Sequence, residues 1–304
     1  MAFVSGSLQG AQRAAAHAIA DEVSAAELER ARGEGTLAGR QEAARILSSS
    51  GGPAGAFLTA LPGGHMTMDD AMFIVAVWHR LGIRVPTDMP SVPCQCSPEV
   101  AAEADHAMVC KKVAKMTQMR HDTLVEALRL VISHTSLQSA LEPRYRTLAG
   151  GARVKNNRRG DIVVVMPRLE MAAVDVVVSH APAPSYAAAA ALGAGRTAAR
   201  AEDRKRSAYR RDMPGRAAVR FVPFAVESCG RMGQEALKFM SALGDVASAS
   251  GRIPKGAFLR WAMQLLSVAL QKGNADMYRR SGLVLAREQG IRYDPGLGVP
   301  VLPD

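Results

Sequence analysis

Two aspartates stand beside or within apolar segments, where an ionised carboxylate is costly. Asp161 precedes the apolar run 162–165, and Asp175 interrupts the apolar run 174–178. A buried carboxylate needs a hydrogen-bond partner, an opposite charge or a metal ion. If the two segments pair as a hairpin, both acids reach one edge of a sheet, where their oxygens suit Mg²⁺. Such an ion can activate water and stabilise charge on phosphate, so the pair predicts phosphodiester cleavage.

Glu142, at the head of the preceding segment, is a candidate third carboxylate of this site. Arginines flank the acids in the sequence, within residues 143–160 and 196–220. The alternative interpretation is therefore that each acid forms a structural salt bridge with one of these arginines.

Three of the four cysteines fall within residues 94–110, together with one histidine. Cys94, Cys96, His106 and Cys110 supply three thiolates and an imidazole, which is a ligand set of closed structural zinc sites. The spacing of His106 and Cys110 puts both on one face of a helical turn. The sequence predicts a zinc knuckle here; the alternative is three unrelated buried thiols and a surface histidine.

Basic side chains gather beside both candidate sites. The chain has 38 Lys and Arg against 28 Asp and Glu, a formal net charge of +10, and such a surplus favours a polyanionic partner, most commonly nucleic acid. The alternatives are a solvated helix face beside the knuckle and a basic surface that binds nothing. The candidate phosphate contacts are Lys111, Lys112, Lys115, Arg120, Arg158, Arg159, Arg204, Arg206 and Arg210.

The elements that position these residues follow from the apolar pattern. Helical periodicity marks residues 121–134, and β-branched runs predict strands at 162–166, 174–178 and 219–227. With a possible strand near 141–148 and an Ala- and Arg-rich helix over 185–211, the order is αβββαβ. We therefore expect an α+β fold with a small mixed sheet, followed by helices at 233–243 and 255–281.

The N-terminal part reads as helical, and its last helix, ending at Leu81, has an apolar face that includes His79. His17, His65, His79 and His180 have no second ligand at metal spacing, so we interpret them as structural or exposed. Four cysteines are too few for a disulfide scaffold, and no run approaches about 18 uninterrupted apolar residues. These features predict an intracellular protein with no membrane partner.

The motifs and their order resemble the C-terminal part of polyproteins of non-LTR retrotransposons that carry a restriction-like endonuclease. The matching motifs are the knuckle, residues 120–122 (RHD), residues 159–161 (RGD) with 174–176 (VDV), and residues 204–209 (RKRSAY). In that family a zinc knuckle precedes a nuclease of the PD-(D/E)XK fold, and both follow a reverse transcriptase. The resemblance spans roughly residues 50–280.

The resemblance implies roles for individual residues. Asp161 and Asp175 match the metal-binding acids of the family, and Lys205 matches the lysine that some relatives carry on the following helix. Its amine would stabilise charge that develops on phosphate. Gly160 stands where the family has proline and Val177 where it has lysine, and these departures leave activity open. The implied cofactors are structural Zn²⁺ and catalytic Mg²⁺ or Mn²⁺.

We therefore expect a helical linker region (1–85), a zinc knuckle with a basic linker (86–120), a PD-(D/E)XK-like endonuclease domain (121–282) and an extended tail (283–304). The expected function is metal-dependent nicking of target DNA for insertion, in the nucleus. DNA, element RNA and the reverse transcriptase portion of the parent polyprotein are the expected partners. No Tyr-x-Asp-Asp polymerase signature occurs, which predicts a fragment or decayed copy of an element. The alternatives are a catalytically inactive, zinc-containing nucleic-acid-binding remnant and an interaction protein in which zinc serves folding alone.

Overall fold

A mixed four-stranded sheet lies at the centre of the protein. The computed structural model describes residues 22–83, 93–94, 97–101, 104–110, 114–143, 160–212, 219–251, 253–288, 292–294 and 299–301. The strands follow each other across the sheet in chain order: β3 (Ser139–Leu141), β4 (Ile162–Val165), β5 (Met171–Ser179) and β6 (Val219–Glu227). The predicted α+β class with a small mixed sheet is confirmed.

The first three strands form an antiparallel meander, and β6 then joins β5 in parallel. A parallel neighbour requires a crossover, because a tight turn can only reverse the chain direction. The crossover consists of α7 (Pro184–Ala190) and α8 (Arg196–Asp212). The helix that the sequence predicts over 185–211 is therefore interrupted, at the Gly193 and Gly195 that separate α7 from α8.

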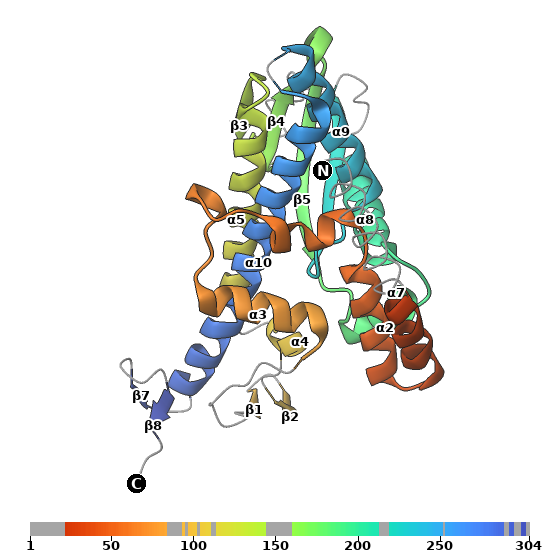
Figure 1. The fold of residues 1–304 in the computed structure, drawn as a ribbon, viewed down its shortest axis with the longest axis vertical. Coiled ribbons are helices and arrows are strands. Elements are labelled where there is room, and N and C mark those ends of the chain that lie inside the picture. The colour runs from red at the N-terminus through yellow and green to blue at the C-terminus, as the bar shows by residue number, and fades with distance from the viewer. Residues whose placement is uncertain are drawn as a thin grey trace, which may run out of the picture.

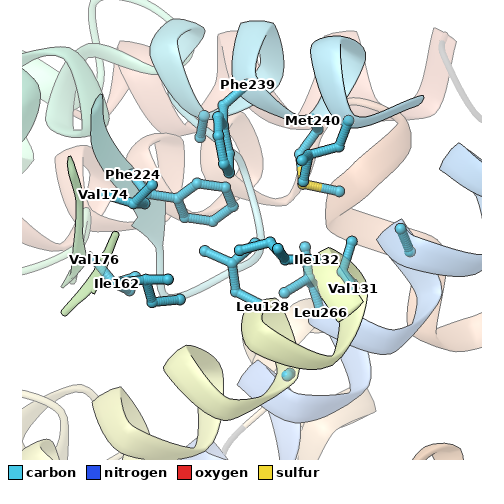
Figure 2. Close-up of a cluster of buried hydrophobic side chains, with 14 of the residues drawn as sticks. Leu128, Val131, Ile132, Ile162, Val174, Val176, Phe224, Phe239, Met240 and Leu266 are labelled. Carbon is cyan, nitrogen blue, oxygen red and sulfur yellow. The ribbon is translucent and has the colours of Figure 1, made fainter. Parts of the chain in front are cut away.

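One face of the sheet carries the main hydrophobic core (Figure 2). Ile162, Val174 and Phe224 project from three strands toward α5 (Ala114–Ser133), α9 (Gln234–Ala249) and α10 (Lys255–Glu288). Leu128 on α5 and Phe239 on α9 meet them there, and all are less than 2% exposed. Each such side chain contributes about 1.5–3 kcal/mol on burial.

The other face of the sheet is covered by α8. Tyr209 of α8 stacks on Phe221 of β6, with ring centroids 4.2 Å apart. Small residues bring the helix close to the sheet at Ala198, Ala201 and Ala225. Since β5 lies between helices on both faces, its sequence from Met171 to Val178 is apolar at every position except Asp175, rather than alternating.

The N-terminal helices pack on the helices of the core. A helix over 22–33 precedes α2 (Leu37–Ser49), which lies against α7, while the 3₁₀ helix η1 (Gly52–Thr59) and α3 (Asp70–Leu81) lie against α10. Figure 1 shows α10 running beside α5, with α3 crossing it. The helical region predicted over 1–85 is thus, where described, in direct contact with the predicted nuclease part.

Two predicted boundaries differ from the structure. The extended tail expected from residue 283 is wrong for its first residues, because α10 continues to Glu288 and no proline stands between Pro254 and Pro295 to end it earlier. The short strands β7 (Arg292–Asp294) and β8 (Val299–Val301) then pair with each other. Helix α5 begins at Ala114, seven residues before the predicted start at 121 and inside the predicted basic linker.

Candidate active site

The register of β4 and β5 brings the two aspartates together. Ile162 pairs with Val174 in the antiparallel ladder. Extending that register by one residue sets Asp161 opposite Asp175 on the same face of the sheet. Their carboxyl groups lie within hydrogen-bonding reach of each other. Two like charges directly opposite destabilise a sheet, so this aspartate pair requires a proton or a cation.

Asp161 is held by two donors that converge on one of its oxygens. Its Oδ2 accepts a hydrogen bond from the Val176 backbone N–H at 2.6 Å and lies 3.2 Å from Nε2 of His121. The Val176 N–H needs a side-chain acceptor because β4 begins at Ile162 and supplies no ladder partner there. Asp161 therefore satisfies the backbone of β5 through Oδ2, while its carboxyl group also faces that of Asp175.

His121, on α5, links Asp161 to a third acid. Its Nδ1 lies 3.1 Å from Oδ1 of Asp122. A ring that donates from both nitrogens must be an imidazolium. Burial acts to lower the pKa of His121, but the hydrogen bonds to Asp161 and Asp122 and their charges outweigh burial and raise that pKa to about 9. The site therefore carries a positive imidazolium at neutral pH.

The pKa values of the two aspartates shift in opposite directions. Burial acts to raise the pKa of Asp161, but His121 and the Val176 N–H lower it below its ordinary value. Burial and the charge of Asp161 raise the pKa of Asp175, against the opposing effect of Lys205. Asp161 is thus the ionised member of the pair, and Asp175 is the member that retains a proton more readily.

Lys205 approaches the pair from α8. Its Nζ lies 2.8 Å from Oδ1 of Asp175. Lys205 stands one helical turn before Tyr209, whose stacking on β6 fixes that side of α8 against the sheet. Four side chains of the site keep between 15% and 30% of their surface exposed: His121, Asp161, Asp175 and Lys205. A ligand from solvent can therefore reach them.

Glu142 adjoins this group through its backbone. Its N–H donates to the carbonyl oxygen of Asp161 at 2.9 Å, at the end of β3. Its φ of 45° turns the chain out of the strand, and its side chain is exposed. The structure therefore brings together Asp161, Asp175 and Lys205, with Glu142 beside them at the sheet edge.

The aspartate pair has the donor set of a divalent metal site. Carboxylate oxygens on neighbouring strands are ligands that Mg²⁺ and Mn²⁺ prefer. A divalent cation would also remove the repulsion between the two acids, in addition to the positive charges that Lys205 and His121 contribute. The residues present fit the predicted catalytic metal.

The predicted phosphate contact of Arg120 is wrong. Arg120 is 2% exposed, and its guanidinium donates to Oδ1 of Asn274 at 3.1 Å and contacts Sδ of Met108 at 3.2 Å. A buried guanidinium cannot reach a phosphate outside the protein. Burial also lowers the pKa of Arg120 to about 10, which leaves it cationic at neutral pH.

Some of the remaining predicted phosphate contacts lie at the surface, and the others lie outside the residues that the structure describes. Lys115, Arg204 and Arg210 are exposed, and Arg206 is half-buried, 2.8 Å from Asp203. Arg204 donates to the Tyr186 hydroxyl at 3.2 Å. The others lie outside the described residues: Lys111, Lys112, Arg158 and Arg159.

Half of the predicted zinc knuckle is described. Cys110 is buried, and its N–H donates to the His106 carbonyl at 2.9 Å, so one helical turn separates these two residues as the spacing predicts. Cys94 ends the strand β1 (Pro93–Cys94), opposite Ser97 of β2 (Ser97–Ala101). The Cys94 side chain and all of Cys96 lie outside the described residues, so the knuckle stays a prediction.

A second cluster of potential ligands was missed by the sequence interpretation. One ligand atom each of His79, Asp105 and His180 lies within 4.8 Å of the others. The one available signal was the position of His79 in an apolar helix face, which marks it as buried. His121 was also given no function, although it stands in one of the motifs that carry the family resemblance.

Compared with known proteins, the sequence matches no model of a protein family and no curated protein. Within the described ranges, no helix has both the length and the apolar character that a membrane crossing requires.

Proposed function

We propose that this protein is a retroelement-derived, divalent-metal-dependent DNA endonuclease of the PD-(D/E)XK type, related to those of non-LTR retrotransposons. The observation that carries the proposal is the cross-strand pair of Asp161 and Asp175, contacted by Lys205 from one element and by His121 from another. Two facing acids with a lysine amine against one of them form a site for a metal ion and a phosphate.

The topology supports the same proposal. Helix α5, the meander β3–β4–β5, the α7–α8 crossover and the parallel strand β6 follow the αβββαβ order expected of this nuclease core. Asp161 directly precedes the central strand β4, Asp175 lies on the central strand β5, and the lysine lies on the crossover helix, as in the relatives whose lysine has moved from the strand. Val177, which replaces the strand lysine, instead packs against α8.

Asp161 and Asp175 would hold the catalytic Mg²⁺ or Mn²⁺. Asp161 offers Oδ1, because Oδ2 already accepts from Val176 and His121. A divalent ion bound here would activate a water molecule and polarise the scissile phosphate. The raised pKa of Asp175 makes it the acid whose proton such an ion must displace.

Lys205 would stabilise charge on the phosphate. Its amine lies at hydrogen-bonding distance from Asp175 and is partly exposed. A phosphate at the aspartate pair would come within reach of the same amine, which would then bind a non-bridging oxygen as its negative charge grows.

His121 is proposed as a positioning residue. As an imidazolium it fixes the orientation of Asp161 and adds a positive charge to a site that contains three acids. A neutral substitute such as glutamine would remove that positive charge, while the Val176 N–H would still donate to Asp161.

The substrate follows from the charges around the site. Arg196, Arg200 and Arg204 recur every four residues on exposed positions of α8, the helix that carries Lys205. A row of exposed arginines beside a phosphate site suits the backbone of DNA. On this proposal the protein nicks target DNA in the nucleus for element insertion. Element RNA and the reverse transcriptase portion of the parent polyprotein are its further partners.

The knuckle is proposed to hold structural zinc. Cys94, Cys96, His106 and Cys110 would be its ligands, and His106 and Cys110 have the helical spacing that such a site uses. Its zinc would stabilise the segment between α3 and α5.

A plasmid-nicking assay tests the proposal. We expect the purified protein to convert supercoiled DNA to the nicked form with Mg²⁺ or Mn²⁺, and not in EDTA. Asp161→Ala and Asp175→Ala should each abolish nicking. Asp203→Ala is the matched control, because Asp203 is an exposed acid that also pairs with a cation on α8.

Two outcomes would reject the endonuclease proposal. Equal nicking by the double aspartate variant would show that the activity comes from another site or from a contaminant. Salt-sensitive DNA binding without nicking in either metal would establish the inactive nucleic-acid-binding remnant instead.

A further inference from the structure

Three elements that are distant in sequence meet at the cluster formed by His79, Asp105 and His180. His79 lies on α3, Asp105 on α4 (Ala104–Ala107), and His180 directly after β5. One nitrogen of each imidazole and one oxygen of Asp105 all lie within 4.8 Å of one another. The cluster thus joins the N-terminal helices, the segment of the predicted knuckle and the central sheet.

His79 is buried without a polar partner. It is 4% exposed, and neither ring nitrogen makes a hydrogen bond with any described residue. Its ring faces His180, with centroids 6.2 Å apart, and meets the Tyr278 ring edge-on at 5.6 Å. A buried imidazole with two unsatisfied nitrogens is costly, and a ligand at one nitrogen would remove much of that cost.

His180 has the hydrogen bond that orients a metal-binding histidine. Its Nδ1 lies 2.7 Å from the Ser228 hydroxyl, which fixes the ring and leaves Nε2 toward the cluster. Histidines that bind metals commonly use their second nitrogen in this way. The Nε2 atom lies 3.1 Å from Oδ1 of Asp105, the distance of an ion pair.

The 3.1 Å separation of His180 Nε2 and Asp105 Oδ1 suits two ligands of one metal ion. Bonds of about 2.0–2.1 Å in a tetrahedron place neighbouring ligand atoms about 3.3 Å apart. Two imidazoles and a carboxylate are ligands of zinc-type ions rather than of Mg²⁺. The charges of Arg45 and Arg120 also act on the cluster and oppose any divalent cation, so bonds from the imidazole nitrogens must supply the affinity.

The same atoms do not make a hydrolase site. The chain from Ser228 through His180 to Asp105 has the partners of a nucleophile relay, but the Ser228 residue is 0% exposed. A nucleophile must reach its substrate, so this serine can orient His180 but cannot attack.

We propose that His79, Asp105 and His180 bind a transition-metal ion of the zinc type, which ties α3 and α4 to the end of β5. The site is separate from the proposed nuclease centre and from the predicted knuckle, although the knuckle residue His106 directly follows Asp105. The three side chains leave one tetrahedral position for a further ligand.

Cobalt binding to the full-length protein tests this site. The protein is stripped with EDTA, reduced, and titrated with Co²⁺ in excess Mg²⁺, so that Mg²⁺ occupies the carboxylate site. We expect His79→Leu to bind one Co²⁺ fewer per chain than the wild type. Any thiolate-to-cobalt absorption band from the knuckle should persist in His79→Leu and disappear in Cys110→Ser. His65→Leu, an exposed histidine on η2 (Gly64–Met66), is the control.

Zn²⁺ should also raise the melting temperature of the wild type more than that of His79→Leu.

If His79→Leu does not fold, Asp105→Asn removes a ligand with little change in size and is expected to show the same loss of one bound Co²⁺. An equal number of bound ions in the wild type and in a folded ligand variant would overturn the proposal. Loss of the thiolate band together with the ion in His79→Leu would also overturn it, since the two sites would then be one.

Discussion

The amine of Lys205 lies 2.8 Å from Oδ1 of Asp175, although 30 residues separate the two in sequence. The contact crosses from the helix α8 to the central strand β5. It connects a positive group to the acid whose pKa is raised, beside the acid whose pKa is lowered. This arrangement underlies the following predictions.

Removal of the Lys205 charge should reduce catalysis more than stability. We expect Lys205→Met to lower the rate of DNA nicking by about 10²–10³-fold, the usual cost of losing one group that stabilises transition-state charge. The free energy of unfolding should fall by about 1–2 kcal/mol, because Asp175, whose side chain is 15% exposed, loses its cation beside Asp161. Lys238→Met on α9 is the matched control, since Lys238 also pairs with a carboxylate, at 3.0 Å from Glu235. Unchanged nicking by Lys205→Met would remove Lys205 from the site.

Neutralising Asp175 should raise the free energy of unfolding, and neutralising Asp161 should lower it. Asp175→Asn removes a carboxylate whose ionisation is disfavoured in the folded state, and we expect it to raise the free energy of unfolding by about 1 kcal/mol. Asp161→Asn presents a neutral amide instead of a carboxylate to the Val176 N–H and to His121. We expect it to lower the free energy of unfolding by about 1–2 kcal/mol. Urea unfolding at pH 7 without divalent metals measures both. Equal destabilisation by the two substitutions would contradict the assignment of the ionised acid to Asp161.

His121 should make stability depend on pH. Its pKa is raised from 6.5 to about 9 on folding, so the folded state binds the proton more tightly. The resulting stabilisation is fully present below about pH 6.5 and is lost as the pH rises through about 9. The shift corresponds to at most about 3 kcal/mol. We expect wild-type stability in EDTA to fall over this range more steeply than that of His121→Gln, and parallel curves would contradict the prediction.

The buried position of Arg120 predicts which arginines bind DNA. Each lost phosphate contact lowers the slope of log affinity against log salt concentration by about 0.9. We expect Arg204→Ala to reduce the slope by about this amount. Arg120→Met, provided that it folds, should leave the slope unchanged, because the Arg120 side chain lies inside the protein. Fluorescence anisotropy at several salt concentrations measures both slopes.

The sequence predicts the sheet well because the signals for it are local. The β-branched runs around Ile162, Val174 and Val222 each form a strand, and the pairing of two such runs already suggests that Asp161 and Asp175 face each other. The contact of Lys205 could not be read from the residues alone. It depends on how α8 crosses the sheet, and only the family resemblance pointed to it.

The burial of Arg120 follows from its spacing to two leucines in the sequence. Arg120, Leu124 and Leu128 are spaced by four residues, so they share one face of α5, and that face is buried. The predicted helix began at residue 121, which left Arg120 outside the pattern. The His79–Asp105–His180 cluster has no comparable local signal, because its members come from three elements that only tertiary packing brings together.

The crossover between β5 and β6 makes the position of Lys205 depend on the last strand of the sheet. Lys205 is carried by the connection itself, and its helix is secured on the sheet largely through β6, where Tyr209 stacks on Phe221. A chain that stopped before β6 would contain every charged group of the proposed nuclease centre and still lack the means to assemble them. Competence for cleavage would therefore arise only after the last strand of the sheet has been synthesised and docked.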